Sequence, residues 1–212
     1  MMTVLNSIAT QHDAWLTTLA ALICLVGSAI TLNLVCKAAL CHGMARYGWH
    51  FLVAIASGST VWCANFVAML AYEPSAPLVL LPDLTILSLV IAVVGTGIGF
   101  VVMTGGFPRF APVIGGAMVG ASIAAMHYIG MLAYRVDGLI EWNLHYFYAS
   151  IALAILFGSL SGQVLMRLRH PISYRLAVLA FATAVVSIHV TSMAALTMTP
   201  AVTSYSARVQ SA

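Results

Sequence analysis

Six long runs of residues without Asp, Glu, Lys or Arg divide this chain of 212 residues. They cover residues 14–36, 47–72, 84–108, 110–134, 142–166 and 176–207. Each run reaches the roughly 20 residues that an α-helix needs to cross a bilayer. The pattern predicts six transmembrane helices, over residues 14–36, 50–72, 84–103, 112–134, 144–166 and 172–198.

The second, fourth and sixth predicted helices carry related motifs at a spacing of 62 residues. The motifs are the pairs Asn65 and Met69, His127 and Met131, and His189 and Met193. Residues four apart lie on the same face of a helix, and a fixed period of this length indicates an internal repeat. Two spans per unit give every unit the same orientation in the membrane. We therefore predict an all-α integral membrane fold of three tandem helical hairpins with pseudo-threefold symmetry.

The composition narrows the class of protein. Hydrophobic residues make up 62% of the chain and charged residues 6%, which is too little charge to cover a soluble domain. The net charge of +3 comes without the basic patch of a nucleic-acid-binding surface, so we expect no nucleic acid partner. The sequence has no Gly-rich phosphate loop, nucleophile elbow or paired carboxylates. We expect the chain itself not to be an enzyme.

Basic residues predict the orientation in the membrane. Most of them lie in three short loops, residues 37–49, 104–111 and 167–175. Cytoplasmic loops carry an excess of Lys and Arg, so these loops are predicted to be cytoplasmic. The N-terminus and residue 212 are then periplasmic, in the inner (plasma) membrane of a bacterium, and the motifs lie in the outer half of the bilayer.

This topology divides the chain into three parts. Residues 1–13 form a short outer segment, residues 14–200 form the membrane domain, and residues 201–212 form a flexible outer tail. The lipid bilayer is the first expected partner.

An ionisable imidazole inside a membrane span predicts a functional site. Thioether sulfur is a soft ligand that selects Cu(I), and imidazole binds copper in either oxidation state. We predict a copper site in which His127 and His189 supply nitrogen and the methionines Met69, Met131 and Met193 supply sulfur. Two histidines from different helices are also typical of axial haem ligation, so haem is the alternative cofactor.

Four neighbouring residues are candidates for the surroundings of the metal. They are Asn65, Met126, Tyr128 and Cys63. Asn65 is a poor copper ligand, so this first copy of the motif is either degenerate or supplies a hydrogen bond. Cys63 is a weaker candidate, because two residues turn it about 160° from Asn65 around the helix. Met126 faces away from His127 and is either a packing residue or an outer ligand.

Met126-His127-Tyr128 followed by Gly130-Met131 resembles the signature of the MHYT family of bacterial integral-membrane sensor domains. The segments around His189 and Asn65 resemble the other two copies of that motif, the latter without its histidine. The resemblance implies copper near the outer face and sensing of oxygen, carbon monoxide or nitric oxide. It also implies a seventh helix leading to a cytoplasmic output, such as GGDEF and EAL domains that turn over cyclic-di-GMP. We therefore expect that the chain was cut before that helix; a stand-alone small protein is the other interpretation.

Rival interpretations of the repeated His and Met residues remain open at this stage. One is a haem-binding sensor, and a second is a membrane protein that handles or transports copper. A third is a structural module with an occluded polar core. Whether the domain forms a homodimer is also left open by the sequence.

Overall fold

The computed structural model describes residues 14–71, 78–105, 110–136, 138–167 and 171–200. Six helices lie within these residues: α2 (Ala14–Leu40), α3 (Gly43–Leu70), α4 (Pro82–Thr104), α5 (Ala111–Ala133), α6 (Leu144–Arg167) and α7 (Pro171–Met193). Each of the six is long and apolar enough to cross a membrane. The predicted six-span fold is confirmed. The expected outer segment 1–13 and tail 201–212 lie outside the described residues.

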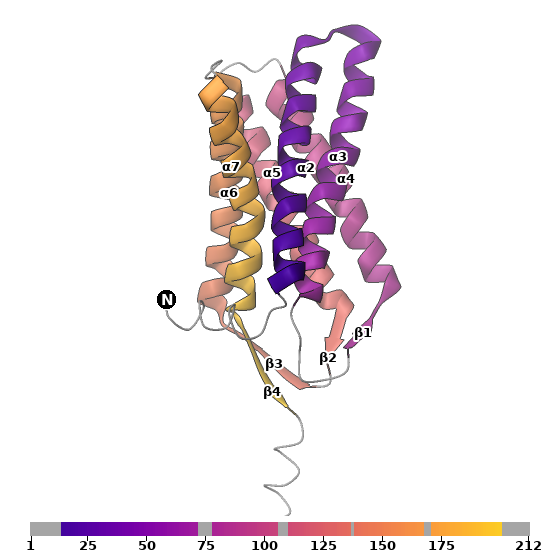
Figure 1. Ribbon diagram of the computed structural model, residues 1–212, viewed down its shortest axis with the longest axis vertical. Coiled ribbons are helices and arrows are strands. Elements are labelled where there is room, and N and C mark those ends of the chain that lie inside the picture. Colours follow the sequence, from indigo (N-terminus) through magenta and orange to yellow (C-terminus); the bar gives the residue numbers. More distant parts are fainter. Residues whose placement is uncertain (1–13, 72–77, 106–109, 137, 168–170, 201–212) are drawn as a thin grey trace, which may run out of the picture.

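The helices form an antiparallel bundle in which each packs against the next along the chain (Figure 1). In addition α3, α5 and α7 contact one another, so these three form the inside of the bundle. The bundle closes where α7 returns to α2, and this contact is the least extensive between neighbouring helices. The three helices that carry the motifs therefore meet around one central axis.

Two short antiparallel strand pairs lie beyond one end of the bundle (Figure 1). Strand β1 (Leu78–Leu80) pairs with β2 (Tyr134–Val136), and β3 (Gly138–Trp142) pairs with β4 (Leu196–Pro200). The sequence pattern did not predict these strands. Each pair joins the segment before a helical hairpin to the segment after it, because β1 and β2 flank α4 and α5, and β3 and β4 flank α6 and α7.

The strand pairs repeat one register after one sequence period. Leu78 is opposite Val136, and Ile140 is opposite Met198, so both partners have moved by 62 residues. The bond next to each pair repeats as well, from Leu81 N to Ala133 O at 3.0 Å and from Asn143 N to Ala195 O at 3.1 Å. This matched backbone geometry supports the repeat independently of the motifs.

Glycine allows two repeat-related pairs of helices to approach closely. A Cβ atom on Gly58 of α3 would lie 2.5 Å from Cα of Val93 on α4, and one on Gly120 of α5 would lie 2.7 Å from Cα of Ile155 on α6. Small residues favour such contacts between membrane helices. The third copy has Ala182 at this position on α7. A methyl group therefore replaces the glycine hydrogen where α7 crosses α2. This pair has the least extensive contact of all neighbouring helices.

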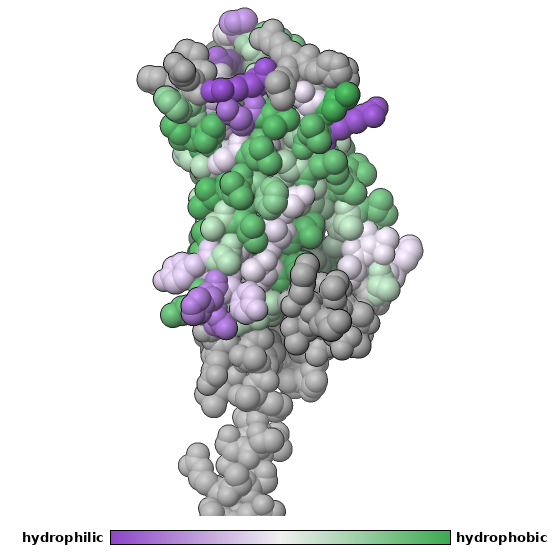
Figure 2. Space-filling view, turned by 90° about the vertical axis from the view of Figure 1, so that its left-hand side faces the viewer, coloured by the Kyte–Doolittle hydropathy of each residue, from purple (hydrophilic) through white to green (hydrophobic). Residues whose placement is uncertain are grey.

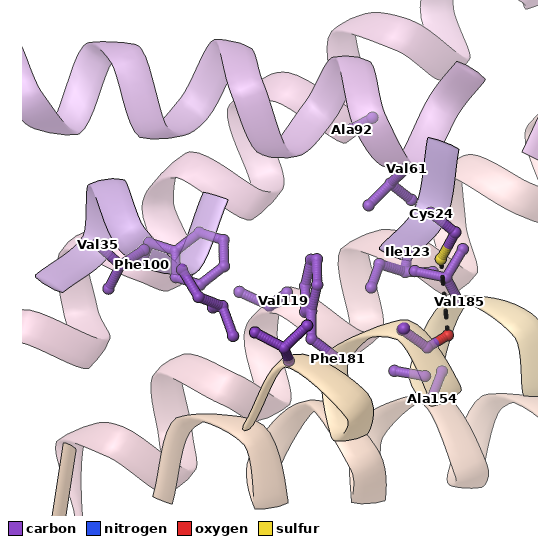
Figure 3. Packing of buried hydrophobic residues seen from close by; sticks show 14 of the residues in the cluster. Cys24, Val35, Val61, Ala92, Phe100, Val119, Ile123, Ala154, Phe181 and Val185 are labelled. Atoms are coloured by element: carbon purple, nitrogen blue, oxygen red, sulfur yellow. Dashed lines mark hydrogen bonds between the residues drawn. The ribbon is translucent and has the colours of Figure 1, made fainter. Parts of the chain in front are cut away.

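Apolar side chains lie both on the outer surface of the bundle and in its core. Large apolar side chains such as Leu22, Phe51 and Ile86 are exposed around the bundle. Figure 2 shows one face of the molecule, on which a hydrophobic band lies between more hydrophilic residues toward its two ends. Inside, buried residues from all six helices form one core, whose Phe100 and Phe181 rings have centroids 6.0 Å apart (Figure 3).

Three predicted helix ends were wrong. The first helix continues to Leu40, and the next begins at Gly43 rather than residue 50. Charges mark where a chain leaves the bilayer, but Lys, Ala and Leu are good helix formers that continue the helix into water. The break falls at Gly43, whose φ of 62° is accessible to glycine. The last helix ends at Met193 instead of residue 198, because the backbone after it pairs as β4.

Candidate metal centre

Three residues one period apart meet at the axis of the bundle. His127 Nδ1 lies 2.6 Å from Asn65 Oδ1, and His189 Nδ1 lies 3.4 Å from the same oxygen. The two imidazole rings are nearly perpendicular, with centroids 5.7 Å apart. The polar triad (Asn65, His127 and His189) thus brings together α3, α5 and α7. The sequence spacing alone indicated the same three positions.

The polar triad lies between two further repeat-related layers. The first, an aliphatic layer, lies one helical turn before the polar triad along α3, α5 and α7. It consists of Val61, Ile123 and Val185, all buried (Figure 3). The second layer lies one helical turn after the polar triad and consists of the motif methionines Met69, Met131 and Met193. Met69 and Met131 are buried and Met193 is half-buried. The aliphatic layer separates the polar triad from the far end of the bundle.

The hydrogen bonds determine the tautomer of His127. The amide nitrogen of Asn65 donates to Met69 Sδ over 3.4 Å, so Asn65 Oδ1 is the acceptor that faces the histidines. A carbonyl oxygen cannot donate, so His127 Nδ1 carries the hydrogen of their 2.6 Å bond. In the neutral ring, Nε2 then holds a lone pair. A histidine that binds a metal through one nitrogen usually donates from the other to such an acceptor.

Ser192 forms a hydrogen bond with the other ring nitrogen of His127, Nε2. Its Oγ lies 2.5 Å from Nε2 and also 2.9 Å from the carbonyl oxygen of His189. A hydroxyl has one hydrogen, so it can donate to only one of these acceptors at a time. The bond to Nε2 satisfies the lone pair of His127, which is 0% exposed. Turning the hydroxyl to the carbonyl would release that lone pair for another ligand.

The other predicted residues have distinct places. Met126 is fully buried within the hydrophobic core and so packs rather than facing His127. The Tyr128 hydroxyl lies 2.5 Å from Ser150 Oγ on α6, and its ring makes an edge contact with His127 at a centroid distance of 5.4 Å. Cys63 is a half-buried free thiol on α3.

Sequence reasoning missed Ser192 and Ser150. Ser192 was visible within the third motif, directly before Met193, but its counterparts one period away are Ala68 and Gly130. A search limited to repeated residue types therefore passes over it. Ser150 has a counterpart in Ser88, which accepts a hydrogen bond of 3.0 Å from the Trp62 indole. The recurrence of serine at positions 88 and 150, one period apart, was the available signal.

The donor set restricts which metals fit. Among the described residues, no group of three or more His, Cys, Asp or Glu side chains is placed so that it could hold a metal ion. The candidate donors are the two imidazoles of the polar triad and, one helical turn away, the thioether sulfurs of the motif methionines, and copper accepts both donor types. The two imidazole rings, whose centroids are 5.7 Å apart, are the nitrogen donors that such an ion would use. The residues present fit copper.

The fold and the polar triad define a multi-pass membrane protein built on an internal repeat. Its family follows from sequence comparison. The model of the MHYT family, described as a bacterial signalling protein N terminal repeat, matches residues 58–116 and 120–180. The two matches begin 62 residues apart, in agreement with the period, and together cover more than half of the chain. The chain belongs to the MHYT family.

Curated relatives are signalling proteins. An uncharacterized signaling protein of Caulobacter vibrioides is 32% identical over 73% of this chain and 18% of its own length. In Pseudomonas aeruginosa, the bifunctional diguanylate cyclase/cyclic di-GMP phosphodiesterase MucR is 30% identical over 82% of the chain and 26% of its own length. The cyclic di-GMP phosphodiesterase NbdA is 35% identical over 71% of the chain and 20% of its length.

The chain therefore spans about a fifth to a quarter of the curated relatives it matches. No solved structure matches it.

Proposed function

We propose that this chain is a membrane sensor module that binds copper at the polar triad and biases a cytoplasmic output involved in cyclic-di-GMP turnover. The output is inferred from MucR and NbdA, whose names state that chemistry. The observation that carries the metal proposal is the pair of imidazoles in the membrane interior, one of them oriented by Asn65. His127 Nε2 and His189 would supply nitrogen, and Met69, Met131 and Met193 are the sulfur candidates.

Copper bound there would supply a soft centre to which a diatomic gas can coordinate. The three ligand-bearing helices are the inner helices of the bundle, so a change at the site acts on all three hairpins together. Binding that favours one arrangement of α3, α5 and α7 over another would shift the population of the module. The basic ends of the helices, with Lys37, Arg46 and Arg167, are proposed to face the cytoplasm.

The geometry favours copper over haem. Ligand pockets usually begin at roughly 300 Å³, whereas the cavity beside Asn65 and His189 has a volume of about 120 Å³. A macrocycle does not fit there without moving helices. Ion transport is less favoured as well, because the aliphatic layer of Val61, Ile123 and Val185 closes the site from the basic end.

Metal analysis of the purified, extensively washed protein tests the proposal. We expect about one copper per chain, lost in His127→Ala and His189→Ala and retained in His145→Ala. His145 is an exposed histidine near the start of α6 and serves as the matched control. A Soret band in the wild type would support haem instead. Copper accumulation in vesicles would support transport, and equal copper in all variants would refute the site.

A further inference from the structure

A mostly apolar pocket lies between α2, α3 and α7, beside the polar triad. Its volume is about 120 Å³. The α2 wall consists of Thr17, Ala20, Ala21 and Cys24. The α3 and α7 walls are also mainly alanine and valine, and the polar side chains Asn65 and His189 complete the lining. The pocket thus leads from the bundle surface to two members of the polar triad.

The pocket opens sideways, within the membrane-spanning part of the bundle. Ala21 on α2 is exposed, and Val186 on α7 is 47% exposed. Deeper in the same gap, Cys24 Sγ lies 3.8 Å from the carbonyl oxygen of Ala182, so the two helices are in contact there (Figure 3). All three wall helices, α2, α3 and α7, are among the six that are long and apolar enough to cross a membrane. The mouth of the pocket therefore faces the hydrocarbon region.

The repeat explains why this opening lies between α7 and α2. Gly58 and Gly120 let α3 approach α4 and α5 approach α6, but α7 has Ala182 at the matching position. The wall residue Ala64 also has larger counterparts, Met126 and Ile188, both fully buried in the core. The α2–α7 side of the bundle is thus more widely spaced and lined by smaller side chains than its two counterparts.

We infer that this pocket is the entry and holding site for a small uncharged apolar molecule, of the size of a dissolved gas, which reaches His189 from the lipid phase. A dry apolar cavity of roughly 150 Å³ binds benzene or xenon, so about 120 Å³ suits a few heavy atoms. Such molecules concentrate in hydrocarbon, which makes a lateral route favourable. The inference rests on the proposed function, because it names the route by which a ligand reaches the copper site.

Xenon tests the pocket without any metal. In lipid nanodiscs, xenon NMR should detect a protein-bound population in the wild type. That population should be lost in Ala68→Leu and weakened in Ala21→Leu, since both alanines line the pocket. Ala125→Leu, at an exposed position of α5 outside the pocket, is the matched control and should keep the wild-type signal. No bound xenon in the wild type, or an equal signal in all variants, would overturn the inference.

Carbon monoxide tests the route to copper. In protein loaded with Cu(I), its binding can be followed by the infrared stretch of the bound gas. We expect association to be about tenfold slower in Ala21→Leu and Ala68→Leu than in Ala125→Leu, an added barrier of about 1.4 kcal/mol. Copper content should stay equal in all three.

The two proposals fail in different ways. A wild type without copper contradicts the proposed function, while the xenon result still decides the pocket. Normal copper loading with equal association rates in all variants contradicts the lateral route alone.

Discussion

The close crossing of α5 and α6 gives a quantitative prediction at Gly120. In Gly120→Ala, the new Cβ would lie 2.3 Å from the backbone oxygen of Ala154 on α6, whereas ordinary contacts begin at 3.4 Å. The difference, about 1.1 Å, must be met by moving α5 away from α6, because a backbone atom cannot turn aside. Overpacking of this kind costs about 1–3 kcal/mol.

Gly130→Ala, on the same helix, is the matched control. Its Cβ would lie 3.6 Å from Phe66 Cε2 and 3.8 Å from Asn65 Nδ2, both ordinary contacts. Both substitutions gain the same helix propensity, about 1 kcal/mol for Ala over Gly. The difference between the two variants therefore isolates the clash at the α5–α6 crossing.

Thermal unfolding in one detergent is the assay. At roughly 2–4 °C per kcal/mol for a chain of this size, we expect the Tm of Gly120→Ala to lie about 2–12 °C below that of Gly130→Ala. An equal or higher Tm for Gly120→Ala would show that α5 and α6 are not in close backbone contact. The arrangement that positions His127 on α5 would then be wrong too.

Three further predictions concern the polar triad and the side chains that contact it. Asn65→Leu removes the acceptor of His127 Nδ1, so we expect a loss of about 1–3 kcal/mol in stability and of about 10–100-fold in copper affinity. An unchanged copper titration would contradict the orienting role of Asn65. Ser192→Ala removes a competitor for His127 Nε2, so copper affinity should rise or stay equal, and a fall would show that the hydroxyl helps to bind the ion. Tyr128→Phe removes the hydrogen bond to Ser150 and should lower stability by about 1 kcal/mol while copper content stays unchanged. Loss of copper in this variant would place Tyr128 among the ligands.

The amino-acid sequence was sufficient for the spans, the repeat and the identity of the central residues. Membrane spans are readable because the hydrocarbon region excludes charge over a fixed length. The repeat is readable because equal spacing places Asn65, His127 and His189 at equal depth on equivalent helices. These are local or periodic properties of the sequence, and they can be recognised without knowing which residues are in contact.

Contacts between segments far apart in the sequence were decided only by the tertiary structure. The strands β1 to β4 exist because the segments before and after a hairpin pair through their backbones, although an apolar run in isolation is equally consistent with more helix. The pairing of Ser192 with His127 joins residues on different helices, and Ser192 has no serine counterpart one period away. The pocket beside His189 depends on how closely α2 approaches α7, which small differences such as Ala182 in place of glycine control. Sequence periodicity determines which residues are equivalent, and packing determines where that equivalence is broken.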